Sequence, residues 1–112
     1  MGGTPMPDLR ELYQEAFDAF TRQDYEQAVT RYQRVIESDP SFALAHQGLA
    51  EVYSRRGQLE EAVGSIRSAI KLEPDESLYH TSLSRFLQMQ GKIPEAEEAA
   101  AAASRLQSGQ GH

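Results

Sequence analysis

The sequence predicts an all-α fold, an α-solenoid of three helix–turn–helix units with six helices. Three observations carry this prediction. Residues of one kind recur at an interval of 34 positions, apolar residues within each unit follow the helical period, and glycine and proline punctuate the units at matching places. A fixed period of this length is typical of stacked repeat architectures.

The interval appears when positions are compared by subtraction. The columns in register are Ala28, Ala62 and Ala96; Gln23, Gly57 and Gly91; Tyr25, Leu59 and Ile93; Val35, Ala69 and Ala103; and Pro40 with Pro74. Five columns over most of the chain indicate repeats at about 9–42, 43–76 and 77–110, within one domain that spans 8–107. We expect flexible tails at residues 1–7 and 108–112.

Each unit contains two stretches whose apolar residues form one helical stripe. In the second halves the stripes have identical offsets: Tyr25, Ala28, Val29, Tyr32, Val35 and Ile36 in the first unit, and Leu59, Ala62, Val63, Ile66, Ala69 and Ile70 in the second. This spacing matches the period of 3.6, and no stretch sustains the alternation of a strand. The expected helices are 8–22, 25–38, 42–56, 59–72, 76–90 and 93–107.

Residues at the expected helix ends agree with these ranges. Asp8 and Asp24 stand where an N-cap is needed. Gly57 and Gly91 fall in the short turns between paired helices, where a positive φ is required. Pro94 falls in the first turn of the last helix, where a missing N–H is harmless.

Composition excludes several classes of function. The 112 residues include no cysteine, which rules out disulfides, thiolate metal sites and cysteine nucleophiles. A net charge of −6 argues against a nucleic-acid binder, because phosphates require a basic face. No apolar run reaches the roughly 20 residues of a membrane helix, and residues 1–7 do not resemble a signal peptide. We therefore expect a cytoplasmic protein without membrane insertion.

The sequence shows no catalytic or metal-binding pattern. No Gly-x-Ser-x-Gly motif is present, and Gly91-Lys92 lacks the spacing of a phosphate loop. His46 and His80 occupy equivalent positions in two units, about one helix diameter apart, which is too far for both to bind one zinc ion. We interpret them as partly buried packing residues and expect no enzyme activity, cofactor or metal.

At signature positions, the second unit resembles the tetratricopeptide repeat family. The matching residues are Leu49, Ala50, Tyr53, Gly57, Ala62, Ala69 and Pro74. The first unit departs from the family pattern at Glu15 and Ala19, and the third unit departs at Ser84, Ala100 and Ser108. The resemblance covers about nine-tenths of the chain and implies a right-handed solenoid. It also implies a non-catalytic interaction module, an adaptor or scaffold that binds a partner peptide or helix in a concave groove.

In this family the first helices of successive units line the concave face. The residues of this sequence at those positions are Arg10, Tyr13, Phe17, Phe20, Leu44, Gln47, Glu51, Arg55, Leu78, Thr81, Arg85 and Gln88. A family clamp for the C-terminal carboxylate of heat-shock chaperones uses lysine and asparagine. Here Tyr13, Phe17, Gly48, Leu78 and Ser82 stand at the clamp positions, which argues against that partner.

The first helix has more apolar residues than one buried stripe needs. Tyr13, Phe17 and Phe20 are additional to that stripe, whereas their counterparts in the second unit are polar. An exposed aromatic row beside arginines is typical of a peptide groove or a subunit interface. Packing against the neighbouring helix explains the rings equally well, so both interpretations stay open.

Two alternatives to the groove also stay open. The last helix is rich in alanine, with Glu97 and Ala100 where the other units have larger apolar residues. This helix either caps the end of the solenoid or docks another subunit, in which case the chain is a self-associating scaffold and a homo-oligomer. The second alternative is that the chain is an accessory domain of a larger assembly.

Overall fold

The computed structural model describes residues 8–109, and these residues form six helices and no strand. The helices are α1 (Leu9–Thr21), α2 (Tyr25–Ser38), α3 (Ala43–Arg55), α4 (Leu59–Leu72), α5 (Ser77–Met89) and α6 (Ile93–Gln107). Every expected helix is confirmed to within one residue at each end. The expected N-terminal tail, 1–7, lies outside the described residues, as do residues 110–112 of the C-terminal one.

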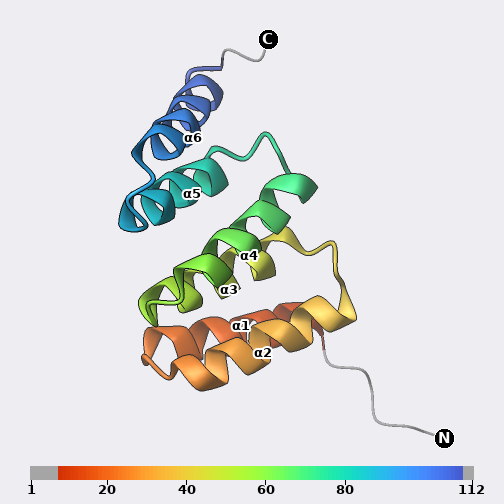
Figure 1. The fold of residues 1–112 in the computed structure, drawn as a ribbon. Helices are drawn as coiled ribbons and strands as arrows, with labels where there is room; N and C mark the ends of the chain where they lie inside the picture. Colours follow the sequence, from red (N-terminus) through yellow and green to blue (C-terminus); the bar gives the residue numbers. More distant parts are fainter. Residues whose placement is uncertain (1–7, 110–112) are drawn as a thin grey trace, which may run out of the picture.

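The helices pack as three successive pairs that stack into an elongated body. The members of each pair contact one another, and α2 contacts α3 as α4 contacts α5, so each unit touches the next (Figure 1). The helices α1 and α6 lie at opposite ends of the stack. The molecule measures 56 × 35 × 19 Å. This arrangement is the all-α solenoid that the 34-residue interval predicts.

The turns inside the three units share one backbone conformation. Gly57 and Gly91 have φ values of 77° and 79°, as their position between paired helices predicts. Gln23 occupies the same column in the first unit and also has a positive φ, of 65°. A side chain there is strained relative to glycine. The first unit therefore keeps the turn of its neighbours at an energetic cost.

The connections between units are held by a repeated hydrogen bond. The Nε2 atom of His46 lies 3.0 Å from the carbonyl oxygen of Pro40, and the Nε2 atom of His80 lies 2.8 Å from that of Pro74. Because a carbonyl only accepts, each Nε2 must carry the proton. Both rings are half-buried. The two histidines thus fasten the inter-unit loops to the helices that follow them.

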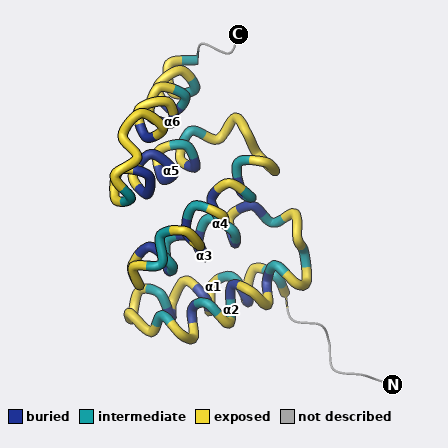
Figure 2. The backbone as a smooth tube through the Cα atoms, viewed as in Figure 1, coloured by how far each residue is buried: buried dark blue, intermediate teal, exposed yellow. Residues whose placement is uncertain are grey.

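The core consists of two apolar clusters, one that joins the first unit to α3 and one that joins the second unit to the third, and Tyr53 packs against both. Along each helix, buried and exposed segments alternate (Figure 2). At the helix contacts Ala16, Ala28, Ala62 and Ala96 have no exposed surface. Small residues allow paired helices to approach to about 8–10 Å.

Gly48 lies directly against the first unit. A Cβ atom added to Gly48 in α3 would overlap the ring of Tyr32 in α2. The Tyr32 ring is only 1% exposed. The absence of a side chain at residue 48 therefore lets this ring fill the space between α2 and α3. Gly64, in the middle of α4, has no atom within 4 Å of an added Cβ.

Two glycine-to-alanine substitutions should change stability in opposite directions. Gly48→Ala should lower the free energy of unfolding by about 1–3 kcal/mol, because the added methyl group overpacks against Tyr32. Gly64→Ala should raise it by about 0.5–1 kcal/mol, because alanine favours the helix and meets no neighbour. Urea denaturation followed by circular dichroism measures both. Equal effects of the two substitutions would contradict the role assigned to Gly48.

Candidate functional site

The first helices of the three units carry all twelve residues that the sequence places on the binding face. We call the surface formed by α1, α3 and α5 the first-helix face. Nine of the twelve residues line two hollows, six in one and three in the other, and the remaining three lie outside both.

The largest group lines a hollow of about 200 Å³ between α1 and α3, which we call the aromatic hollow. Its lining residues are Tyr13, Phe17, Phe20, Tyr32, Gln47, Gly48, Glu51 and Arg55. Six of these are predicted site residues. Tyr32 and Gly48 were not among the predicted site residues, because Tyr32 belongs to a second helix and Gly48 has no side chain.

The aromatic row of α1 is divided between packing and exposure. The ring of Tyr13 stacks on that of Phe42 at 5.6 Å and meets that of Tyr32 edge-on at 5.8 Å, between ring centroids. The ring of Phe20 lies 6.0 Å from that of Tyr25. Phe17 is 43% exposed. Packing therefore accounts for Tyr13 and Phe20, whereas Phe17 faces solvent, and a binding role for Phe17 stays a prediction.

Burial raises the pKa of the Tyr13 hydroxyl. Burial also raises the pKa of Tyr32, and the charges of Tyr13 and Glu51 raise it further. Both phenols therefore stay neutral around pH 7. The hollow thus combines uncharged aromatic walls with charged groups only at Glu51 and Arg55.

Glu51 is the centre of a polar cluster that joins α3 to α5. Its carboxylate accepts hydrogen bonds from Arg85 Nη2 at 2.8 Å, Arg85 Nη1 at 3.3 Å and Ser82 Oγ at 3.3 Å. Gln47 Nε2 adds a longer bond at 3.4 Å. The Glu51 side chain is 16% exposed and that of Arg85 is 47% exposed. Two predicted binding residues, in equivalent positions of successive units, therefore bind each other.

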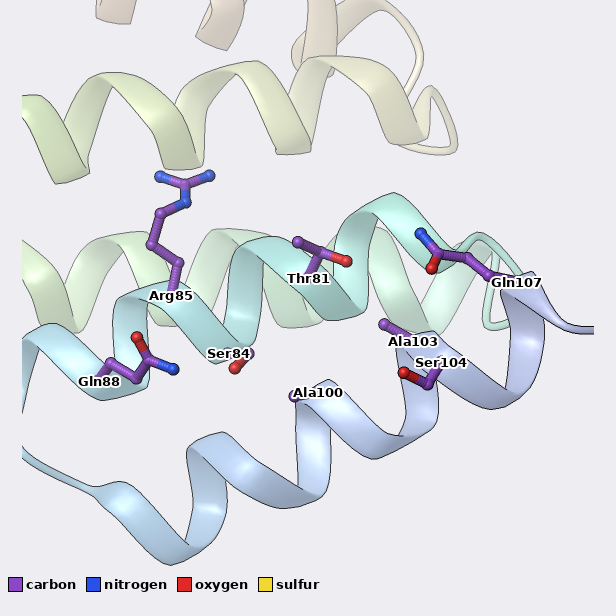
Figure 3. Close-up of a pocket in the computed structure, with 8 residues that line it drawn as sticks. All are labelled: Thr81, Ser84, Arg85, Gln88, Ala100, Ala103, Ser104 and Gln107. Atoms are coloured by element: carbon purple, nitrogen blue, oxygen red, sulfur yellow. The ribbon is translucent and has the colours of Figure 1, made fainter.

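The second group lines a hollow of about 320 Å³ between α5 and α6, the terminal hollow. Figure 3 shows its lining residues Thr81, Ser84, Arg85, Gln88, Ala100, Ala103, Ser104 and Gln107, with Arg85 directed away from α6. Three of them are predicted site residues. Ser84 Oγ donates to the carbonyl oxygen of Ala96 at 2.8 Å, so this serine fastens α5 to α6.

The remaining predicted residues lie apart from both hollows. Arg10 lies near the start of α1, in a shallow depression that it shares with Asp8, Glu11 and Gln14. Leu44 and Leu78 occupy the first turns of α3 and α5 and are 43% and 47% exposed. These two leucines occupy equivalent positions, 34 residues apart, and both are exposed apolar side chains on the first-helix face.

Residues 8–109 contain no group of three or more His, Cys, Asp or Glu side chains placed to hold a metal ion. Within the same range, every helix is too short or too polar to cross a membrane.

A family model described as a tetratricopeptide repeat matches residues 19–86, which is more than half of the chain. The chain belongs to the tetratricopeptide repeat (TPR) family. A search of curated proteins finds no match to this TPR chain.

Solved structures share the fold of this TPR chain. MamA matches with a TM-score of 0.88 and 19% identity, over 93% of this chain and 61% of MamA, so the chain spans about three-fifths of that protein. The second TPR domain of Spaghetti (RPAP3), bound to the HSP90 peptide SRMEEVD, matches with a TM-score of 0.83 and 24% identity. The match covers 88% of this chain and 91% of the Spaghetti domain. The type III secretion chaperone SycD of Yersinia enterocolitica, in complex with a peptide of the translocator YopD, matches with a TM-score of 0.85 and 24% identity. The match covers 88% of this chain and 75% of SycD.

The Glu51–Arg85 pair should couple the second and third units measurably. A double-mutant cycle with Glu51→Ala and Arg85→Ala should give a coupling energy of about 0.5–1.5 kcal/mol, because the carboxylate is largely buried while the guanidinium is half exposed. Urea denaturation supplies the four free energies of unfolding.

The pair Glu15–Arg31, at the same N–O distance of 2.8 Å, is the matched control. Its side chains are 53% and 35% exposed, and its coupling should not exceed about 0.5 kcal/mol. A Glu51–Arg85 coupling no larger than that of the control would show that the pair does not hold the units together.

Proposed function

We propose that this TPR chain is a non-catalytic interaction module, and that its first-helix face binds an extended or helical segment of a partner protein. The observation that carries the proposal is the aromatic hollow, where a 43% exposed Phe17 stands beside packed aromatic rings. Exposed aromatic residues next to a concave surface are typical of anchoring sites for a partner's side chains.

The comparisons support a segment rather than a small molecule as the ligand. The Spaghetti domain is described with an HSP90 peptide and SycD with a peptide of YopD. Both share the fold of this chain, and for this chain we propose that the segment lies across α1, α3 and α5. The partner itself differs among TPR proteins, because the family signature consists of packing residues.

We propose further that the partner is not the C-terminus of a heat-shock chaperone. At the family's clamp positions this chain has no lysine or asparagine. The space at Gly48 is taken by the Tyr32 ring, and Ser82 donates to Glu51. Neither position therefore offers a group for a terminal carboxylate.

Selection from a randomised twelve-residue peptide library, displayed on phage, tests the proposed function. A peptide enriched on the immobilised chain should shift the amide resonances of α1, α3 and α5 in ¹⁵N-labelled protein. Phe17→Ala should weaken that peptide's binding about tenfold, since an exposed aromatic anchor is worth more than 1 kcal/mol. Fluorescence polarisation measures the dissociation constants.

Leu72→Ala is the matched control, because Leu72 is similarly exposed, at 39%, but belongs to α4. It should leave the affinity unchanged. Resonance shifts confined to α2, α4 and α6, or a loss of binding with Leu72→Ala alone, would place the binding surface on the second helices instead.

Self-association is the second candidate, and the terminal hollow favours it. The corresponding face of the first unit, around Tyr32 and Val35, packs against α3, and that of the second, around Ile66 and Ala69, packs against α5. In the third unit this face stays open among the described residues.

If copies dock there, light scattering after size-exclusion chromatography should show a mass that rises with concentration, and Ala100→Glu should suppress the rise. A constant monomer mass would exclude this candidate.

A further inference from the structure

The walls of the aromatic hollow define what kind of side chain fits inside it. Tyr13, Phe17 and Phe20 come from α1, and the ring of Tyr32 reaches the hollow because Gly48 leaves space for it. A concave site with several aromatic walls favours a large apolar side chain, because burying a large side chain removes the most apolar surface from water. Its volume of about 200 Å³ has room for one such side chain.

The negative group of the hollow is already engaged. The Glu51 carboxylate accepts two bonds from the Arg85 guanidinium and further bonds from Ser82 and Gln47. Its charge is balanced by Arg85, and only 16% of its side chain is exposed. A cationic ligand could contact the aromatic faces, but it would find no unpaired carboxylate there and would be repelled by Arg55.

The positive group of the hollow is in the opposite situation. The Arg55 guanidinium carbon lies 5.4 Å from the centroid of the Phe20 ring, and the residue is exposed. Within residues 8–109, no carboxylate forms an ion pair with it. A guanidinium held over an aromatic ring keeps its N–H groups available and matches the two oxygens of a carboxylate. Arg55 thus rests over the Phe20 ring and is still able to bind an anion.

From these three observations we infer the chemistry of the partner segment, on the basis of the function proposed above. The aromatic hollow takes one large apolar side chain of the segment, and Arg55 pairs with an aspartate or glutamate close to that side chain in sequence. Arg55 itself lines the hollow, and an extended chain advances about 3.3 Å per residue. We take the segment to be extended at the hollow, and the carboxylate therefore lies within about two residues of the apolar anchor.

The peptide library again provides the probe, now read by sequencing before and after selection. Three proteins are compared: the natural chain, Arg55→Gln and Arg56→Gln. Arg56 is the neighbouring exposed arginine and does not line the aromatic hollow, so it is a matched control for the loss of one positive charge. Circular dichroism checks that all three proteins are folded.

The natural chain and Arg56→Gln should enrich peptides in which Asp or Glu stands within two positions of Leu, Met, Phe, Tyr or Trp. Arg55→Gln should retain the apolar preference and lose the acidic one. For the best peptide, replacing that acid by its amide should weaken binding about tenfold to the natural chain, as expected for a lost charge-assisted bond, and should have no effect on Arg55→Gln. Fluorescence polarisation measures these affinities.

Three results would overturn the inference. Peptides that bind the first-helix face without acidic enrichment, or with lysine and arginine enriched instead, would refute the assignment of Arg55 while leaving the proposed function in place. Loss of the acidic preference in both arginine variants would mean that it reflects net charge and not the hollow. A library that yields no peptide dependent on Phe17 would overturn both this inference and the proposed function.

Discussion

The close approach of paired helices at small residues is the constraint on which the rest of this structure depends. Ala28, Ala62 and Ala96 recur at the interval of 34 and are completely buried. Because a larger side chain at these points would push the helices apart, they fix the geometry of each pair. Larger residues then fill the remaining space, and Tyr32 does so by projecting from α2 against Gly48 of α3. The floor of the aromatic hollow is a consequence of this packing.

The repeat also explains how one backbone presents three different chemical surfaces. Equivalent positions on the first helices hold Phe17, Glu51 and Arg85. The first is an exposed aromatic ring, whereas the second and third form an ion pair across the unit boundary. Because packing residues specify the solenoid, the outward positions are free to vary from unit to unit. The aromatic hollow therefore belongs to the first two units alone.

The helices could be predicted from the sequence because their signals are local. Apolar period, caps such as Asp8 and turn glycines such as Gly57 act within a few residues, and all six ranges agree with the structure. The positive φ of Gln23 could not be predicted from its residue type, because glutamine ordinarily avoids that conformation. The turn between α1 and α2 imposes this conformation on Gln23, whereas the equivalent turns of the other two units have glycine at that position.

The candidate site was only partly predictable because it depends on contacts between helices. Glu51 and Arg85 are opposite charges in one repeat column, so their pairing could have been inferred from the interval of 34. Arg55 lies over Phe20, which belongs to a different column, and a comparison of equivalent positions cannot reveal that contact. The role of Gly48 depends on how α2 and α3 meet, and a helical stripe does not contain that information.

The overall charge of the chain bears on how much the aromatic walls of the hollow and Arg55 would each contribute to binding. With a net charge of −6, the protein as a whole repels an acidic segment, whereas Arg55 attracts it locally. Salt screens both effects over a Debye length, about 8 Å at physiological ionic strength, so Arg55 attracts the acid only once the two groups are close. If the segment inferred above binds there, its apolar side chain would supply most of the affinity, and Arg55 would select among apolar segments by the charge beside the anchor. Such a division favours a site that first excludes water around Phe17 and only then forms the ion pair, because a guanidinium–carboxylate contact in full solvent contributes little.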